Sequence, residues 1–354
     1  MGSLAMVLHP RFLLLFPFAL SGLFFVWRKS TTFGLKNPAR KAFFVIGQGR
    51  TGTTLIGDFF NEREDVVYFF EPLRTVELYL NKIYFRMNNT EERFEYNRIA
   101  NRFLGNLVNC KFDKFDDELL KFHEVGQFRY RSKKLTGGHF CTPEHCPVLT
   151  ASALNQYCEK NPHLNIVIKE LEFRIPDADI TKLFRRYDRD FVLHLVRDPR
   201  AFLSSVKKLK WFLPYHAEVA KRENTFLYER CRETGNNIVK MHNVFKTNLE
   251  FPRGNYMILR YEDLADEDII ARLGLELSVF TGTDFTKTVR SLMKNRNTEK
   301  VNTGAVANPF STHSRRVNDS IKKWREEGDK IFISKVEHYC RELMMVLGYE
   351  KAKW

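Results

Sequence analysis

The sequence lacks the features that define several common classes of protein. It contains no internal repeat, no low-complexity stretch, no Cys-x-x-Cys pair and no Cys/His spacing typical of a zinc finger. Repeat architectures and paired-cysteine zinc or redox sites are therefore excluded. The positive charge is spread along the chain and forms no dense basic tail, which argues against a nucleic-acid partner.

What the sequence does contain is an excess of positive charge. Lys and Arg number 57 against 43 Asp and Glu, so the net charge of the 354 residues is +14 at pH 7. Such a surface attracts polyanions, including anionic lipids, nucleotide phosphates and acidic glycans. Hydrophobic residues make up 44% of the chain, which is enough to bury one large core, and we expect one catalytic domain.

An uncharged run occupies residues 12–27 (FLLLFPFALSGLFFVW). It predicts a transmembrane signal-anchor, slightly short for an average bilayer, between a cytoplasmic tail at 1–11 and a stem at 28–41. The catalytic domain would then span 42–354. A cleaved signal peptide is the alternative, because Ala19-Leu20-Ser21 offers a small-x-small cleavage site.

Features of the sequence favour opposite orientations of this anchor. More positive charge follows the run than precedes it, which by the positive-inside rule would keep the domain cytoplasmic. Two sequons, Asn88-Asn89-Thr90 and Asn318-Asp319-Ser320, and an even number of cysteines suit a lumenal domain instead. We therefore expect a single-pass type II protein with a lumenal catalytic domain.

The six cysteines permit two interpretations, disulfides in an oxidising compartment or buried thiols. Four of them lie between Cys110 and Cys158. Within that segment His139 and His145 bracket two cysteines in HFCTPEHC, which suggests a metal cluster at first sight. The spacing does not match a closed zinc site, and the two prolines favour a loop tied by a disulfide, so no metal is expected.

Five apolar runs rich in β-branched and aromatic residues predict strands buried on both faces. They occur at Ala42–Ile46, Val66–Phe70, Ile166–Ile168, Phe191–Val196 and Tyr256–Leu259. Helical patterns lie between them at Thr53–Asn61, Ala201–Leu209 and Arg230–Phe245. The predicted fold class is α/β, a parallel sheet flanked by helices on both faces, with a P-loop-like first turn.

The first strand runs into the glycine-rich segment Gly47–Thr54 (GQGRTGTT), which is followed by an apolar-periodic helix. Strand, glycine loop and helix together predict a phosphate site, because backbone N–H groups and the helix N-terminus face the same point. A nucleoside triphosphate site would require Lys where Thr53 stands. The fixed cation is Arg50 instead, which disfavours a kinase and suits a sulfuryl donor that needs no metal.

The fourth strand ends in a second candidate anion site. Arg197 follows the strand, where open α/β sheets bind ligands, and Ser205 lies about two helical turns further on. Asp198 is placed to pair with Arg200. By itself this segment (VRDPRAFLSS) is compatible with an ordinary strand-to-helix turn at the surface.

Together the two segments resemble the PAPS-dependent sulfotransferase superfamily, and within it the Golgi carbohydrate 6-O-sulfotransferases that act on galactose, N-acetylglucosamine or N-acetylgalactosamine. The resemblance covers nearly the whole catalytic domain. It includes a late segment at 310–325, Tyr261–Leu264 and the terminal Leu347-Gly348-Tyr349. It implies PAPS (3′-phosphoadenosine 5′-phosphosulfate) as co-substrate, which becomes PAP (3′-phosphoadenosine 5′-phosphate) after transfer. It also implies a glycan acceptor, either a glycosaminoglycan or a glycoprotein oligosaccharide. It also implies a Golgi location, and a homodimer stays open.

The resemblance also implies roles for particular residues. The 5′-phosphosulfate side of the donor would be held by Gly49, Arg50, Thr51, Gly52, Thr53 and Thr54. The 3′-phosphate would be held by Arg197, Ser205 and Arg315. Glu71, at the end of the second strand, is the implied general base, with Arg50 stabilising the transferring group. The alternative is that Glu71 is structural and forms an ion pair with Arg50 or Arg74.

Two departures from the family pattern concern the acceptor. Residues 73–76 (LRTV) lack the Trp and His that many members have after the leucine, and Val206 replaces a common arginine. The sugar and its carbon are therefore not predicted. Three rival functions remain: an ATP-dependent kinase, a lumenal polyanion-binding lectin with this fold, and a protein-tyrosine sulfotransferase. Lys207 and Lys208 predict either a solvated helix face or a track for acidic glycans.

Overall fold

The computed structural model describes most of the chain from residue 40 onward. The described residues are 40–84, 87, 89–126, 128–142, 144–184, 189–208, 213–247, 255–298 and 317–353. Within these ranges no helix has the length and apolarity needed to cross a membrane. The signal-anchor expected at 12–27, the cleavage site, Asn88 and Arg315 lie outside the described residues, as does all of the stem except its last two residues.

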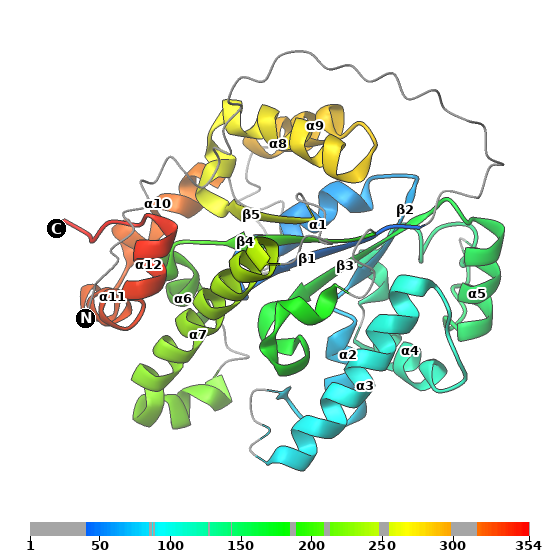
Figure 1. Ribbon diagram of the computed structural model, residues 1–354, viewed down its shortest axis with the longest axis horizontal. Coiled ribbons are helices and arrows are strands. Elements are labelled where there is room, and N and C mark those ends of the chain that lie inside the picture. Colours follow the sequence, from blue (N-terminus) through cyan, green and yellow to red (C-terminus); the bar gives the residue numbers. More distant parts are fainter. Residues whose placement is uncertain are drawn as a thin grey trace.

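A five-stranded parallel sheet forms the centre of the molecule (Figure 1). Its order is β2-β3-β1-β4-β5, and every neighbouring pair is parallel. Phe44 of β1 lies opposite Ile168 of β3 on one side and Val192 of β4 on the other. The strands are β1 Ala42–Gly47, β2 Val66–Phe70, β3 Asn165–Leu171, β4 Asp190–Val196 and β5 Tyr256–Arg260. The α/β fold class and all five predicted strands are confirmed.

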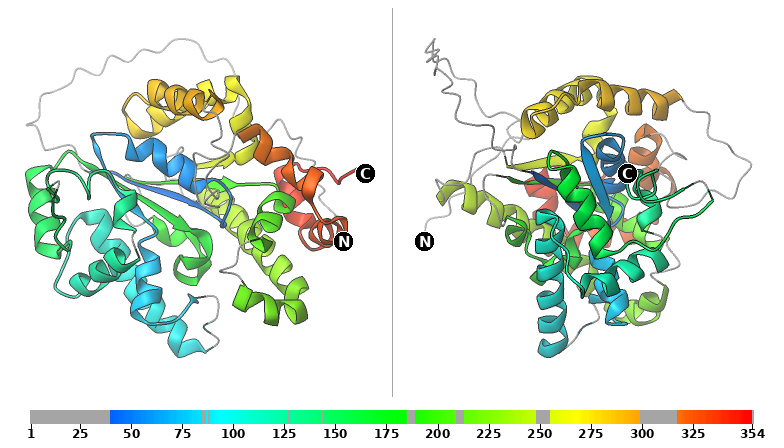
Figure 2. Two further views of the ribbon diagram at one scale, coloured as in Figure 1. Left: turned by 180° about the vertical axis from the view of Figure 1, so that it is seen from behind. Right: turned by 90° about the vertical axis from the view of Figure 1, so that its right-hand side faces the viewer.

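Helices cover both faces of this sheet, as the continuous apolar strands require (Figures 1 and 2). The first part of the chain contributes α1 Thr53–Asn61, α2 Leu73–Tyr79, α3 Thr90–Asn109, α4 Asp116–Val125, α5 Ala151–Lys160, α6 Pro199–Lys207 and α7 Leu213–Thr247. The rest contributes α8 Glu267–Thr281, α9 Thr286–Thr298, α10 Val317–Glu327, α11 Lys330–Tyr339 and α12 Arg341–Leu347. Short 3₁₀ turns connect them: η3 Arg129–Arg131, η4 Glu172–Arg174, η5 Pro176–Ala178, η6 Ile180–Leu183 and η8 Tyr261–Ala265.

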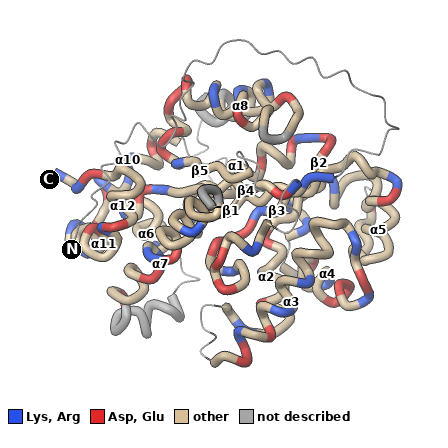
Figure 3. Tube along the Cα trace, in the orientation of Figure 1, with Lys and Arg blue, Asp and Glu red and all other residues tan. Residues whose placement is uncertain are grey.

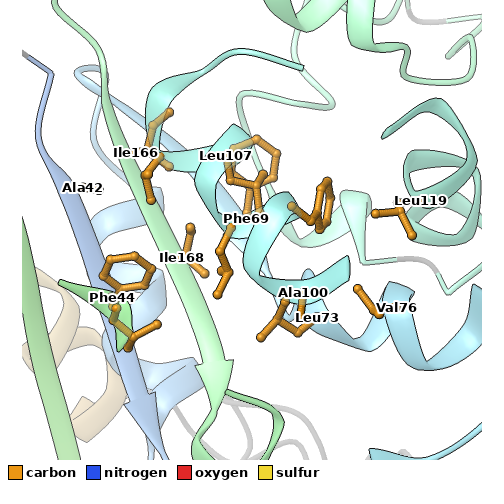
Figure 4. Packing of buried hydrophobic residues seen from close by; sticks show 14 of the residues in the cluster. Ala42, Phe44, Phe69, Leu73, Val76, Ala100, Leu107, Leu119, Ile166 and Ile168 are labelled. Carbon is orange, nitrogen blue, oxygen red and sulfur yellow. The ribbon is translucent and has the colours of Figure 1, made fainter. Parts of the chain in front are cut away.

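Alternate residues of β1 enter different cores. Phe44 packs with Phe69 and Ile168 against α2, α3 and α4 (Figure 4). Phe43 points to the opposite face, where it stacks on Phe60 of α1 and Phe191 of β4. Each fully buried side chain of this size contributes about 1.5–3 kcal/mol. The two cores therefore hold β1, the strand from which the glycine loop emerges, on both faces of the sheet.

Two helices differ from their predicted limits. Helix α6 begins at Pro199, two residues before the predicted Ala201, because the Asp198 side chain accepts from the Arg200 N–H and proline suits the first helical position. Helix α7 begins at Leu213, well before the predicted Arg230. Its first half lacks the regular apolar pattern from which the prediction was made.

All six cysteines pair. The disulfides join Cys110 to Cys158, Cys141 to Cys146 and Cys231 to Cys340. The first two tie the segment between the second and third strands, and the Cys141–Cys146 bond closes the predicted loop. The third joins α7 to the start of α12 across 109 residues. The disulfide interpretation of the cysteines is thus the one that the structure shows.

Candidate functional site

The glycine loop that follows β1 has the geometry of a phosphate cradle. The Gln48 carbonyl accepts two hydrogen bonds, from the Thr51 N–H at 3.3 Å and from Thr51 Oγ1 at 2.7 Å. Arg50 and Gly52 take left-handed backbone angles, with φ of 74° and 94°, which turns the chain sharply before α1 begins at Thr53. The loop therefore leads into the positive end of a helix dipole, as an anion site requires.

Close packing fixes the position of this loop. A Cβ atom on Gly52 would come within 2.5 Å of the Tyr261 ring, and one on Gly47 within 2.4 Å of the Leu195 carbonyl oxygen. Only glycine fits at these two points. Among the other predicted donor residues, Thr51 and Thr53 are buried, whereas Gly49, Arg50 and Thr54 are partly exposed. The exposed members are the ones that a ligand could reach directly.

The second predicted anion site lies against the first. Arg50 Nε donates to Ser205 Oγ at 3.1 Å, and Arg197 Nη1 donates to the Arg50 carbonyl at 2.9 Å. The Arg197 guanidinium lies 4.3 Å from the centre of the Tyr261 ring, and its Nη2 donates to the Ser320 carbonyl of α10 at 2.7 Å. Parallel neighbours β1 and β4 bring these segments to one sheet edge, which the sequence could not establish.

Segments distant in sequence support this edge. Glu262 accepts from the Asp198 N–H at 3.1 Å and from the Tyr349 hydroxyl at 2.6 Å. Asp198 also pairs with Arg200 at 2.8 Å, as expected. The Arg197 Nε atom is buried and has no hydrogen-bond partner among the described residues. An anion bound at this edge would provide one. Arg315, the third predicted ligand, belongs to the part of the chain that is not described.

Glu71 lies immediately after β2, with a left-handed φ of 46°. Neither of its expected partners, Arg50 or Arg74, pairs with it. Its carboxylate instead forms ion pairs with Lys169 of β3 and with Arg174, whose Nη1 lies 2.7 Å from Glu71 Oε2. Arg74 pairs with Glu77 of α2 at 2.6 Å. The predicted base is therefore held in a network of charges that sequence reasoning did not foresee.

Arg174 is the centre of this network. It donates to Glu77 at 2.9 Å and to Glu170 at 3.2 Å as well as to Glu71. We call Glu71, Glu77, Lys169, Glu170 and Arg174 the Glu71 cluster. Its other four members are 5% exposed or less, while the Glu71 side chain keeps 15% of its surface. Of the five, Glu71 is thus the member that solvent or a substrate reaches most easily.

Burial and charge act in opposite directions on Glu71. Burial by itself disfavours the ionised carboxylate, but Lys169 and Arg174 lower its pKa from 4.5 to about 2. Glu170 differs, because burial and the neighbouring charge of Glu71 raise its pKa to about 7, although Arg174 opposes this. At neutral pH Glu71 is therefore ionised.

The residues missed by sequence reasoning share a recognisable position. Lys169, Glu170, Glu172 and Arg174 (KELEFR) end and follow a buried parallel strand. Charged side chains at the carboxyl end of such a strand are candidates for a site in any open α/β sheet. The predicted strand ended at Ile168, one residue before these charged residues begin. They matter because β3 pairs with β2, which brings Lys169 beside Glu71.

Other candidates from the sequence have simpler explanations. His139 packs on Phe140 and Tyr157, and the described part of the chain contains no group of His, Cys, Asp and Glu that could hold a metal. His194 is fully buried beside Tyr256. Lys207 and Lys208 lie on an exposed helix face and form ion pairs with Asp329 and Glu327. Figure 3 shows basic and acidic residues interspersed over the described elements.

Comparison with known proteins finds carbohydrate sulfotransferases among the relatives of this chain. No family model matches the chain. Carbohydrate sulfotransferase 3 of Tetronarce californica is 25% identical over 343 residues, which span 89% of this chain and 74% of that protein. Human carbohydrate sulfotransferase 3 is 26% identical, over 89% and 68% of the two chains. Human carbohydrate sulfotransferase 6 is 24% identical, over 92% and 85%.

Solved structures give more distant likenesses. The sulfotransferase domain of the Synechococcus PCC 7002 olefin synthase aligns with a TM-score of 0.45 and 16% identity, over 90% of this chain and 97% of that one. Retinol dehydratase, solved with retinol and PAP, aligns with a TM-score of 0.43 and 16% identity, over 89% and 84%. The sequence relationship is the informative one: over about nine-tenths of its length the chain is a homologue of carbohydrate sulfotransferases, which are enzymes of the sulfotransferase class.

Proposed function

We propose that this protein transfers a sulfuryl group from PAPS to a hydroxyl of a glycan. The observation that carries the proposal is the meeting of Arg50, Arg197 and Ser205 at the edge of the sheet where the glycine loop lies. In a homologue of carbohydrate sulfotransferases, two adjacent anion sites fit a donor with phosphate at both its 5′ and 3′ positions. An ATP-dependent kinase with a loop of this type would require a lysine at the position of Thr53, and this chain lacks that lysine.

The two anion sites have different roles in this proposal. The loop from Gly49 to Thr54 surrounds the 5′-phosphosulfate, and Arg50 stabilises charge on the sulfuryl oxygens and on the leaving phosphate. Arg197 and Ser205 hold the 3′-phosphate, joined by Arg315 from the segment that is not described. Thr51 contributes through loop shape, since its hydroxyl donates to the Gln48 carbonyl. No metal takes part.

Transfer proceeds by in-line attack of the sugar hydroxyl on sulfur. A new S–O bond forms to the acceptor oxygen, the S–O bond to the 5′-phosphate breaks, and PAP leaves with the bonding electrons. Glu71 accepts the hydroxyl proton. With a pKa of about 2 it is a weak base, so the proton moves late, when the acceptor oxygen has already become acidic. Lys169 and Arg174 keep the carboxylate ionised and fixed in place.

The acceptor is proposed at the level of its class. From the resemblance of the sequence motifs to Golgi carbohydrate 6-O-sulfotransferases we infer 6-O transfer to galactose, N-acetylgalactosamine or N-acetylglucosamine in a glycosaminoglycan or a glycoprotein oligosaccharide. The carbohydrate sulfotransferases among the relatives support a glycan acceptor.

The proposed location follows from the same relationship. Three disulfides suit an oxidising compartment, which supports a domain in the secretory pathway. We propose a Golgi membrane protein of type II, with a tail at 1–11, an anchor at 12–27, a stem at 28–41 and a lumenal domain at 42–354. Reporter fusions and protease protection of isolated microsomes test this orientation, and cleavage of the domain by external protease would overturn it.

The decisive experiment measures sulfate transfer by the full-length protein from radiolabelled PAPS. Desulfated chondroitin, desulfated keratan and N-acetylglucosamine serve as acceptors, each with and without a chelator. We expect transfer that the chelator does not affect. Glu71→Gln should lower kcat about 10²- to 10⁴-fold in protein that is folded and still binds PAP, because the amide cannot accept the hydroxyl proton.

A matched control separates this effect from a general loss of negative charge. Glu64→Gln removes a carboxylate that pairs with Lys134 at the surface, and its kcat should stay unchanged. A folded protein that binds no PAP and transfers sulfate to no acceptor would overturn the proposed function and favour the lectin. Transfer to a tyrosine peptide alone would change the acceptor class.

A further inference from the structure

A buried polar network connects the glycine loop with helix α7 and lies outside the proposed catalytic groups. Its centre is Glu172, at the end of the third strand, whose side chain is fully buried. Gln48 Nε2, in the loop itself, donates to Glu172 Oε2 at 3.1 Å. Thr234 and Asn237 of α7 donate to the same carboxylate at 2.8 and 2.6 Å.

The network continues from Glu172 through His194 of β4 to Tyr256 of β5. The His194 Nε2 atom lies 3.6 Å from Glu172 Oε2, and its Nδ1 lies 2.8 Å from the Tyr256 hydroxyl. Gln48 also donates to Thr234 Oγ1 at 3.3 Å. Burial opposes ionisation of Glu172, but His194, Asn237 and Thr234 lower its pKa below the ordinary value. The carboxylate is therefore charged, and Gln48 is one of the donors that compensate it.

Both the side-chain amide and the main-chain carbonyl of Gln48 form hydrogen bonds, so this residue connects the buried network with the loop. Its side-chain amide is fixed by Glu172 and Thr234, and its carbonyl accepts both hydrogen bonds from Thr51 that close the loop. The residue is 3% exposed, so a donor nucleotide would not touch its side chain. Rotation of Gln48 would displace the turn that begins the phosphate cradle.

We propose that Gln48 and Glu172 are positioning residues that set the shape of the phosphate loop and couple it to α7. This inference rests on the proposed function, because the quantity it governs is affinity for the nucleotide. Neither residue contacts the nucleotide. Removal of either should weaken nucleotide binding through the loop, beyond any effect on folding.

The test measures PAP binding to the full-length protein by calorimetry, with thermal unfolding of each variant recorded in parallel. Gln48→Met keeps the volume and loses the amide, and PAP affinity should fall about tenfold, the size of one lost hydrogen bond to a charged group. Gln48→Glu places a carboxylate beside Glu172 and should weaken binding further. Gln48→Glu combined with Glu172→Gln exchanges the two groups and should restore affinity to within about threefold.

A buried amide at the opposite end of the sheet provides the matched control. Asn255 donates to the Asp190 carbonyl at 3.1 Å, far from the loop along the strands. Asn255→Ala should lower the unfolding temperature without changing PAP affinity. If Gln48→Met lowers only the unfolding temperature, or if the exchanged pair binds no better than Gln48→Glu, the inference is overturned and the network is structural.

The same measurement separates this inference from the proposed function. Wild-type protein that folds and binds no PAP removes the proposed function and the inference with it. Wild-type protein that binds PAP while Gln48→Met binds it equally well removes the inference alone. If Gln48→Met does not fold, the comparison of Gln48→Glu with the exchanged pair gives the answer.

Discussion

The glycine loop and the Glu71 cluster lie at neighbouring strand ends of one sheet, but different interactions hold them. The loop is fixed by main-chain contacts and close packing, such as the Arg197 bond to the Arg50 carbonyl and the approach of Gly52 to Tyr261. The Glu71 cluster is fixed by buried charges, with Arg174 bridging three carboxylates. A change in the cluster should therefore affect stability first, and a change at the loop should affect ligand binding first.

Arg174→Met should give the largest effect on stability. It leaves Glu71, Glu77 and Glu170 without their shared cation, and breaking a buried network in this way costs about 3–5 kcal/mol. Denaturant unfolding measures the loss. Arg98→Met removes an exposed pair with Glu95 and should cost less than about 1 kcal/mol. Equal losses in the two variants would mean that the buried cluster contributes no more to stability than an exposed ion pair.

Arg197→Ala should act on binding instead. Loss of a charged donor to the 3′-phosphate is expected to weaken PAP binding about 10- to 100-fold, with a smaller effect on stability. Calorimetry on the full-length protein measures the affinity. Arg260→Ala is the matched control. Arg260 also lies at the end of a strand, donates to a main-chain carbonyl and lies over a tyrosine ring. If both variants lose affinity equally, Arg197 has no specific part in the donor site.

The acid stability of the protein should report the charges around Glu71. A carboxyl whose folded pKa is about 2, below its ordinary 4.5, stabilises the fold fully above pH 4.5 and loses this contribution as the pH falls through 2. Lys169→Met should raise the pKa of Glu71 by at least about one unit, or about 1.4 kcal/mol. The contribution should then be lost at a higher pH.

Unfolding free energies measured between pH 2 and 6 test this expectation. Lys82→Met, which removes a surface partner of Glu92, is the control and should keep the wild-type profile of unfolding free energy between pH 4.5 and 2. A Lys169→Met profile that coincides with that of wild type would mean that Lys169 does not hold Glu71 ionised.

The smallest effect is expected at Lys207 and Lys208. Both pair with exposed carboxylates, so replacing both with Ser should change stability by less than about 1 kcal/mol and leave PAP affinity within twofold. Acceptor binding at low and high salt completes the test. A marked loss of glycan binding that disappears at high salt would show that these lysines form a track for acidic glycans.

Local features of the chain could be predicted from the sequence because they depend on interactions between residues that are close together in the chain. Continuous apolar runs predicted five parallel strands, and glycine spacing with an absent lysine predicted a phosphate loop of unusual type. Val66–Phe70 and Thr53–Asn61 were predicted with their observed limits. The proline and Asp198 cap that begin α6 were also present in the sequence, although the prediction began the helix two residues late.

By itself, then, the sequence determined the fold class, the phosphate loop and the approximate positions of the five strands, because each depends on residues close together in the chain. Tertiary structure decided which strand ends are neighbours. Strand β3 lies between β2 and β1, so Lys169 and Arg174, not Arg50 or Arg74, reach Glu71, and Gln48 reaches Glu172. Partners separated by 98 to 124 residues are chosen by strand order and helix packing, and no spacing along the chain records that choice.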